Sequence, residues 1–169
     1  MIEMQVMGIA LDTRTGSPIV VLNDKQNRKA LPIWIGSAEA SAIIRKMENI
    51  KVARPMTHDL LCNIVESTGF RVDRIEIHDV TEETYYANIC LVGEDGKEIA
   101  VDSRPSDAIA VAIRTKSPIF VTSNVIADGT ISTDQAKDEE EAEEFRQFIQ
   151  DIKPSDFQKL MDANDESDQ

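Results

Sequence analysis

Residues 101–114 read VDSRPSDAIAVAIR and contain a sharp change of structural pattern. Strand-like residues end before the Arg-Pro pair, and Ile109 and Ile113 then recur at helical spacing. Pro105 accounts for the change, because proline pushes the residue before it toward extended geometry and fits the first turn of a helix. The stretch predicts a strand that passes directly into a helix beginning at Ser106.

A similar arrangement occurs fifty residues earlier, in RPMTHDLL (54–61). Both segments place Arg-Pro before a hydroxyl residue and an aspartate. We predict that Thr57 and Ser106 are N-caps, because a hydroxyl oxygen can accept a hydrogen bond from a free backbone N–H at a helix start. Asp59 and Asp107 fall in the first turns, where the helix dipole favours a carboxylate. Capping alone is a complete explanation of these four residues.

Outward from these two segments, apolar residues alternate in some runs and recur every three or four residues in others, which predicts strands and helices respectively. The expected strands span residues 1–11, 17–22, 30–35, 70–80, 85–92, 98–101 and 118–125, and the expected helices span 38–48, 57–68 and 106–116. We predict Ser37 as the N-cap of the first helix. Clustered strands with helices between them predict an α+β fold, with helices packed on a largely antiparallel or mixed sheet.

The order of these elements indicates an internal duplication. Residues 37–45 align with residues 106–114 through a shared serine, a shared isoleucine and a shared final arginine. Three strand-like runs precede each of the two helices. We therefore expect a possible internal βββα duplication.

Trp34, in the apolar run LPIWIG, is expected in the core.

The net charge of −13 is concentrated at the end of the chain. Residues 1–131 hold 14 Lys and Arg against 18 Asp and Glu, whereas residues 132–169 hold 4 against 13. We predict a folded domain at 1–131 and an acidic C-terminal segment at 132–169 with one or two short helices. Such a segment can be a solvated appendage, a helix docked on its own domain, or an interaction arm. It can also repel nucleic acid, or lie across an arginine cleft as a phosphate mimic.

The start of the chain, its apolar runs, its cysteines and its missing motifs indicate which classes of protein and function are disfavoured. The sequence begins without a basic and apolar leader, and no apolar run approaches the roughly 20 residues that span a bilayer, so we expect a soluble cytoplasmic protein without membrane contact. Cys62 and Cys90 lack a Cys-x-x-Cys spacing, which predicts two buried, unpaired thiols. The sequence has no Gly-rich phosphate loop, His-Glu-x-x-His or Gly-x-Ser-x-Gly, which disfavours nucleoside-triphosphatase and serine-hydrolase functions.

Two arginines precede the predicted helix starts. Arg54 and Arg104 would place guanidinium groups beside free backbone N–H groups, and together they could cradle a phosphate. The alternative is that each forms a salt bridge with a nearby aspartate. His58 lies at a helix start and could act as a general acid or base near neutral pH, although a lone histidine can also be structural.

Carboxylates near these arginines could bind a divalent cation. Mg²⁺ and Mn²⁺ prefer oxygen ligands. The candidate ligands are Asp59, Asp102, Asp107 and Glu39.

The segments LPIWIG (31–36), RPMTHDLL (54–61) and VDSRPSDAIAVAIR (101–114) together resemble the bifunctional nuclease family of bacteria and plants. The resemblance covers about residues 1–130. It implies an α+β fold, a homodimer or higher homo-oligomer, and nuclease activity on DNA and RNA.

The residues and the resemblance together predict a metal-assisted nuclease that acts on DNA or RNA. The catalytic candidates are His58, Asp59, Asp102 and Asp107, and the phosphate-binding candidates are Arg54, Thr57, Arg104 and Ser106. The alternative is a non-enzymatic oligomeric module that binds an anion or a protein through the same cleft.

Overall fold

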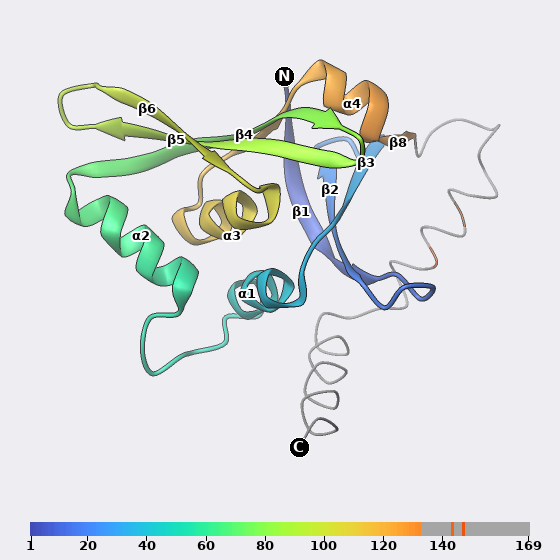
Figure 1. The fold of residues 1–169 in the computed structure, drawn as a ribbon, viewed down its shortest axis with the longest axis horizontal. Helices are drawn as coiled ribbons and strands as arrows, with labels where there is room; N and C mark the ends of the chain where they lie inside the picture. Colours follow the sequence, from blue (N-terminus) through green and yellow to red (C-terminus); the bar gives the residue numbers. More distant parts are fainter. Residues whose placement is uncertain (133–142, 144–146, 148–169) are drawn as a thin grey trace.

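The change from strand to helix at Pro105 is present in the computed structural model, which describes residues 1–132, 143 and 147 (Figure 1). The strands are β1 (Ile2–Leu11), β2 (Pro18–Asp24), β3 (Lys29–Trp34), β4 (Phe70–Thr81), β5 (Thr84–Gly93), β6 (Glu98–Ser103), β7 (Ile119–Val121) and β8 (Ile131–Ser132). The helices are α1 (Ser37–Met47), α2 (Thr57–Ser67), α3 (Pro105–Thr115) and α4 (Ser123–Gly129). Apart from the two isolated positions, the predicted short helices of the acidic segment lie outside the described residues.

The described strands form one sheet in the order β6-β5-β4-β7-β1-β2-β3-β8. Neighbouring strands are antiparallel except β4 and β7, which are parallel. The sheet is therefore mixed, and the predicted α+β class is confirmed. Two antiparallel meanders, β1 to β3 and β4 to β6, lie on either side of β7, and a helix follows each of them. This order agrees with the expected duplication.

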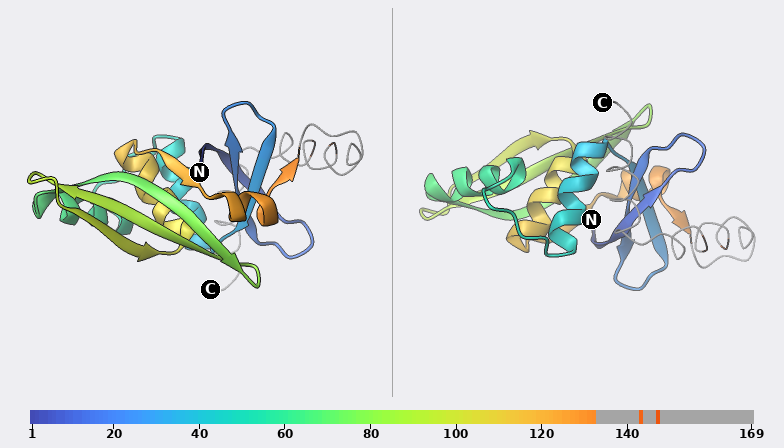
Figure 2. Two further views of the ribbon diagram at one scale, coloured as in Figure 1. Left: turned by 90° about the horizontal axis from the view of Figure 1, so that it is seen from above. Right: turned by 90° about the horizontal axis from the view of Figure 1, so that it is seen from below.

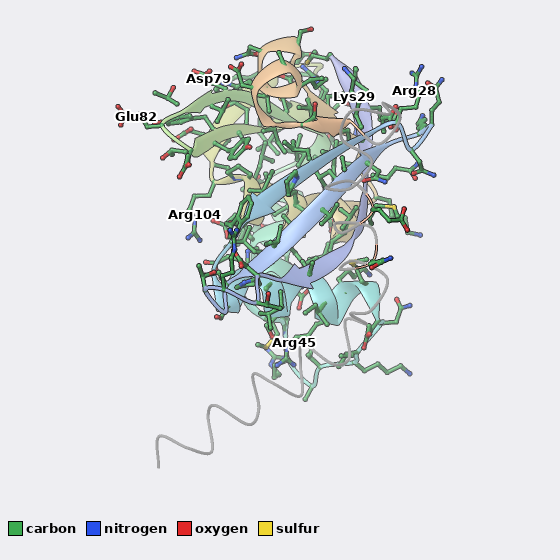
Figure 3. All side chains as sticks on the ribbon, turned by 90° about the vertical axis from the view of Figure 1, so that its right-hand side faces the viewer. Arg28, Lys29, Arg45, Asp79, Glu82 and Arg104 are labelled. Carbon is green, nitrogen blue, oxygen red and sulfur yellow. The ribbon has the colours of Figure 1, made fainter. Side chains whose placement is uncertain are left out.

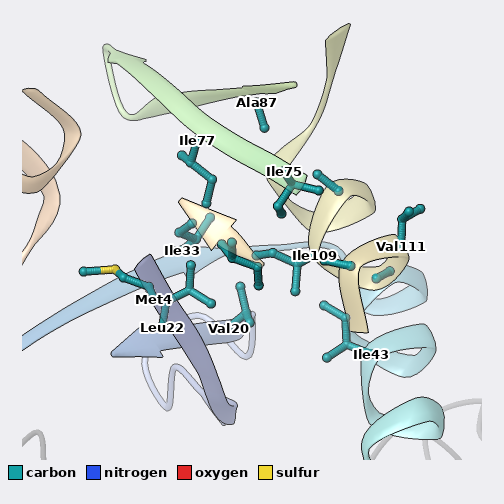
Figure 4. Packing of buried hydrophobic residues seen from close by; sticks show 14 of the residues in the cluster. Met4, Val20, Leu22, Ile33, Ile43, Ile75, Ile77, Ala87, Ile109 and Val111 are labelled. Carbon is teal, nitrogen blue, oxygen red and sulfur yellow. The ribbon is translucent and has the colours of Figure 1, made fainter. Parts of the chain in front are cut away.

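The core lies between the sheet and its helices. Seen from below, α1, α2 and α3 lie in front of strands β4 to β6 (Figure 2). Buried aliphatic side chains from both meanders and from α3 meet between these layers (Figure 4). Val20, Leu22, Ile75, Ile77 and Ile109 are essentially inaccessible to solvent. Burial of each such side chain contributes about 1.5–3 kcal/mol, so this cluster holds α3 firmly against the sheet.

The predicted N-caps are wrong at all three helices. The N-cap positions belong to Gly36, Met56 and Arg104, and none of them makes a side-chain cap hydrogen bond. At α3, Pro105 occupies the first helical position, because it lacks an N–H and its fixed φ angle suits that place, so the helix begins before Ser106. At α2, the carboxylate of Asp59 accepts a hydrogen bond from the backbone N–H of Met56, with an N–O distance of 3.0 Å.

Two further predictions about the chain are wrong. The strand predicted at 118–125 is only β7, and α4 begins at Ser123 because Val125 and Ile126 turn toward the core as one face of a short helix. Trp34 is not in the core: it ends β3, is 52% exposed, and donates its indole N–H to Asp12 Oδ2 at 3.1 Å.

Two other expectations can be compared with the structure. The thiols of Cys62 and Cys90 are buried and unpaired, as predicted. Among the described helices, none is long and apolar enough to cross a membrane.

Candidate functional site

Four side chains from three helices form one hydrogen-bonded chain, which we call the Arg104 network: Glu39, Arg104, Asp107 and His58. Arg104 Nη2 donates to Glu39 Oε1 at 2.7 Å, and Arg104 Nε donates to Asp107 Oδ2 at 2.8 Å. His58 Nε2 lies 2.9 Å from Asp107 Oδ1. The network therefore ties the first turns of α1 and α2 to the start of α3.

The two oxygens of Asp107 serve different partners, the guanidinium of Arg104 and the ring of His58. The side chain of His58 is 11% exposed. Its Nδ1 has no hydrogen-bond partner among the residues that the structure describes. A carboxylate on one ring nitrogen fixes the orientation of an imidazole and leaves the other nitrogen for proton exchange. The ring of His58 is thus held in a fixed orientation by Asp107.

Arg104 is engaged by carboxylates and is not a free phosphate ligand. Its hydrogen bonds to Glu39 and then to Asp107 raise the pKa of its guanidinium, so the group stays charged. Because two carboxylates, those of Glu39 and Asp107, contact the single guanidinium of Arg104, the Arg104 network carries no excess positive charge. The alternative that we left open for Arg104, a salt bridge, is the one that the structure contains.

A second network surrounds Arg114, whose side chain is only 8% exposed. Its Nε donates to Asp59 Oδ1 at 2.8 Å, its Nη1 to the carbonyl of Ala110 at 2.9 Å, and its Nη2 to the carbonyl of Ala42 at 3.0 Å. One guanidinium therefore joins α1, α2 and α3. From the sequence alone, Arg114 matches Arg45 in the duplication and has no predicted role in a site.

The partners of Asp59 change its acidity. Burial alone would raise the pKa of this carboxyl, but hydrogen bonds from Arg114 and from the backbone of Met56 outweigh it, and the pKa is lowered. Asp59 is therefore ionised at neutral pH, and its carboxylate forms an ion pair with Arg114. Its geometry is that of a structural anchor for α2.

Asp59→Asn should destabilise the fold at neutral pH and flatten its response to acid. Because the folded-state pKa lies below the unfolded value of about 3.9, the ionised carboxylate stabilises the fold fully above about pH 5. That stabilisation is lost as pH falls through the lowered folded-state pKa. Urea unfolding from neutral pH downward should give a wild-type minus variant difference that is constant and then shrinks. Asp102→Asn is the control, and equal profiles for both variants would contradict the role of Asp59.

A basic groove of about 620 Å³ lies along the loop between α1 and α2. Five cationic side chains and one carboxylate, that of Asp59, are part of its lining; the cations are Arg45, Lys46, Lys51, Arg54 and Arg114. Within residues 1–132, none of the first four forms an ion pair with a carboxylate. The groove is therefore a concentration of positive charge on an acidic protein. Of its cations, only Arg54 is a site residue predicted from the sequence.

The predicted cradle of Arg54 and Arg104 is not formed. Arg54 shares the groove with Arg114 near the end of α3, whereas Arg104 caps the start of that helix. Arg114 lies ten positions after Arg104 along α3, a rise of about 15 Å. In Figure 3 the labelled Arg45 of the groove and Arg104 likewise lie in separate places.

Other predicted site residues lie apart from both networks. Asp102 is exposed on β6, pairs with Asn88 in the sheet, and has no side-chain hydrogen bond or ion pair in the described part of the chain. Thr57 is exposed at the first position of α2, and Ser106 is buried at the second position of α3. Neither lines the basic groove.

The four carboxylates proposed as metal ligands do not converge. Across the described ranges, no group of three or more His, Cys, Asp or Glu side chains is placed to hold an ion. Arg104 forms hydrogen bonds to both Glu39 and Asp107, and Arg114 forms one to Asp59. These carboxylates do not fit a Mg²⁺ or Mn²⁺ centre in this arrangement, so we assign no chemical step to a metal.

Comparison with known proteins adds an independent finding. The family model described as Bifunctional nuclease domain matches residues 20–134. The chain is 32% identical over 163 residues to an uncharacterized protein of Mycobacterium tuberculosis, covering 92% of this chain and 97% of that protein.

Two plant proteins also match. Bifunctional nuclease 2 of Oryza sativa subsp. japonica is 31% identical over 124 residues, which are 71% of this chain and 38% of that protein. Bifunctional nuclease 1 of Arabidopsis thaliana is 32% identical over 113 residues, which are 61% of this chain and 35% of that protein. This chain thus spans little more than a third of either plant relative.

Proposed function

Because this chain belongs to the bifunctional nuclease domain family, we propose that it hydrolyses phosphodiester bonds in DNA or RNA. The observation that supports this most is the basic groove, which Met56 and Asp59 line on either side of His58 in the sequence, although His58 itself contacts Asp107 and does not line the groove. We propose that a nucleic-acid strand bound by the cations of the groove extends past the first turn of α2 to His58, since a phosphodiesterase uses both phosphate-binding cations and an acid or base.

The groove suits a nucleic-acid backbone. Arg45, Lys46, Lys51 and Arg54 are available to phosphates because none of them forms an ion pair with a carboxylate within residues 1–132. Among the described residues that line the groove, none has an aromatic side chain on which a base could stack. We therefore propose that binding rests on phosphate contacts, which give affinity without sequence preference.

His58 is the proposed catalytic residue. Its Nδ1 accepts a proton from a water molecule as the water oxygen forms a bond to phosphorus, and the bond from phosphorus to the leaving sugar oxygen breaks. The leaving oxygen takes a proton from solvent. Asp107 is a positioning residue that holds the opposite ring nitrogen and stabilises the imidazolium as it forms.

The direct test uses the full chain with plasmid DNA and labelled RNA, each with and without EDTA. Degradation that persists in the purified wild type and is lost in a folded His58 variant supports the proposal. The EDTA arm tests separately the prediction that Mg²⁺ or Mn²⁺ assists the reaction. Degradation that is unchanged in the variant would point to a contaminating nuclease.

Lys51→Gln/Arg54→Gln should weaken nucleic-acid binding and reduce its dependence on salt. Each lost phosphate contact lowers the slope of log affinity against log salt by about 0.7–0.9, so the double variant should lose about 1.4–1.8. Fluorescence anisotropy over a salt series measures the slope. Arg71→Gln/Lys97→Gln removes the same charge from β4 and the β5–β6 turn, outside the groove. Equal slope changes in both double variants would show a general field effect and contradict specific binding in the groove.

One observation favours the non-enzymatic alternative. The ring of His58 is mostly buried and already bonded to Asp107, as a structural histidine would be. On that alternative, the groove of a homo-oligomeric module binds an anion without hydrolysing it. Wild-type binding that depends on Lys51 and Arg54, with no hydrolysis of either substrate, would identify this function. We propose a homo-oligomer in both cases, which light scattering tests.

A further inference from the structure

A second pocket, of about 750 Å³, lies where the turn between β4 and β5 meets β3 and the end of α4 (Figure 1). We call it the β3 pocket. Its described lining shares no residue with the Arg104 network or with the basic groove. In Figure 3 the labelled Glu82 of this pocket and Arg45 of the groove lie well apart. The volume falls within the range of about 300–1,000 Å³ that is typical of small-molecule sites.

One wall of the β3 pocket is an exposed tryptophan that is held in a fixed orientation. Trp34 is 52% exposed, and its indole N–H donates to Asp12 Oδ2 at 3.1 Å. Asp12 is 6% exposed, and its Oδ1 accepts a hydrogen bond from the backbone N–H of Arg14 at 3.0 Å. These hydrogen bonds, first that from Trp34 and then that from Arg14, lower the pKa of Asp12, so its carboxylate is charged. A ring that is half exposed and yet tied down offers its face to a ligand.

A second aromatic ring, that of Tyr85, also lines the pocket. It packs against the core and against Gly129 at the end of α4. A Cβ atom at position 129 would lie 2.7 Å from the hydroxyl oxygen of Tyr85, so a larger residue there would displace the ring. This hydroxyl has no hydrogen-bond partner among the residues that the structure describes, and it can accept a hydrogen bond from a ligand.

The β3 pocket is acidic, in contrast to the basic groove. Its described lining includes one cation, Arg14, and four carboxylates, those of Asp12, Glu82, Glu83 and Asp128. Arg14 lies 3.5 Å from Asp12, and the other three carboxylates form no ion pair within residues 1–132. The pocket therefore has an excess of three negative charges.

The turn between β4 and β5 is an unfavourable place for two glutamates. Thr81 pairs with Thr84, so Glu82 and Glu83 alone make the turn, with φ angles of 48° and 63°. Two-residue turns with positive φ at both positions favour asparagine and glycine, which tolerate this backbone. Backbone preference therefore does not account for the glutamates, whereas their place in the lining of the pocket gives them a use.

We propose that the β3 pocket binds an aliphatic amine with two or more ammonium groups. The surplus carboxylates attract positive charge and repel phosphate, so the nucleic acid of the proposed function does not fit here. Within the described ranges, no three of them are placed to hold one metal ion, so the matching positive charges are spread along a longer ligand. An ammonium over the face of Trp34 gains a cation–π attraction, and the methylene groups of the amine cover the ring. A metal ion would use neither aromatic ring.

Fluorescence of Trp34 tests the proposal directly, because it is the single tryptophan of the chain. Titration of the full chain with spermidine, a triamine, should change this fluorescence with saturation at one molecule per chain. The titration is run in about 0.15 M salt, where the Debye length is about 8 Å and distant charges contribute little. The diamine cadaverine should bind more weakly than spermidine, and choline, with a single charge, more weakly still. Mg²⁺ at the same concentration of charge should leave the fluorescence unchanged.

Two double variants separate the pocket from the general field of an acidic protein. Glu82→Gln/Glu83→Gln should weaken spermidine binding by about tenfold or more, because it removes two charged partners of the ammonium groups. Glu94→Gln/Glu98→Gln removes the same charge at the other end of β5, outside the pocket, and should change the affinity by less than about twofold.

Single variants keep the test decisive if the double change disturbs the turn. Asp128→Asn, on α4, removes a carboxylate without altering the hairpin and should weaken binding in the same direction. Trp34→Leu, measured by calorimetry, should lose more affinity than Trp34→Phe, which keeps an aromatic face.

The proposal is overturned if spermidine leaves the fluorescence of Trp34 unchanged, if Mg²⁺ reproduces the change, or if both double variants lose affinity equally. Tighter binding of tetralysine than of spermidine would assign the pocket to the lysines of a protein and overturn the assignment to a small amine. None of these outcomes depends on whether the protein hydrolyses nucleic acid.

Discussion

His58→Gln should lower the rate of phosphodiester hydrolysis by about 10²–10⁴-fold, the usual contribution of a general acid or base. The amide of glutamine can still donate a hydrogen bond to Asp107, but it cannot take up a proton near neutral pH. Nucleic-acid affinity should change little, because the cations of the basic groove are untouched. Single-turnover hydrolysis of a labelled oligonucleotide, with affinity measured in parallel, separates the two quantities.

The other histidine of the chain supplies the matched control. His78 lies in β4, outside both networks, so His78→Gln should retain the wild-type rate. Asp107→Asn tests the positioning role, because it keeps the shape of the side chain but removes the charge that stabilises the imidazolium. Its rate should fall, with a shift in the dependence of rate on pH. A folded His58→Gln protein with undiminished hydrolysis would remove His58 from the mechanism.

Arg114→Met should cost about 3 kcal/mol in the free energy of unfolding, the lower end of the range for breaking a buried ion pair. The variant leaves the carboxylate of Asp59 and the carbonyl of Ala42 without their partner and loosens the contact of α3 with α1 and α2. Urea unfolding at neutral pH measures the change.

An exposed arginine provides the comparison for Arg114. Arg71 forms an ion pair with Asp73 and is 69% exposed, so Arg71→Met should cost less than about 1 kcal/mol. Arg114→Lys should fall between the two, because lysine keeps the charge but cannot make three hydrogen bonds in a fixed fork. Similar costs for Arg114→Met and Arg71→Met would mean that the buried guanidinium does not join the helices.

The local rules of sequence predicted the order of the strands and three of the helices, because alternation and helical spacing are properties of neighbouring residues. They placed the helix starts wrongly where two preferences competed. A serine favours the N-cap, but Pro105 favours the first helical position, and the proline determined where α3 begins. The position of Ser106 followed from its neighbour and not from its own preference.

The candidate site was predicted only in part, because it depends on which side chains meet in space. His58 and Asp107 are 49 residues apart in the sequence. Both were predicted as site residues because they lie at helix starts, and the fold brings these two helix starts together. Asp102 was predicted because it lies close to Arg104 in the sequence, at the end of a strand, but in the structure it is exposed on an edge strand. Lys46 and Lys51 follow no motif, and only the path of the α1–α2 loop makes them neighbours of Arg54.

The position of β7 in the sheet has a consequence for synthesis of the chain. Ile2 of β1 pairs with Val121 of β7, which is synthesised 119 residues later. One edge of β1 therefore stays unpaired until β7 has been made. At about 5–20 residues per second, that interval is about 6–24 s. Throughout it the nascent chain carries an unpaired strand edge, to which the equivalent strand of another nascent chain on the same message could add. Closure of the sheet is therefore a late event, and we expect aggregation during expression to depend on translation speed more strongly than on the stability of the finished fold.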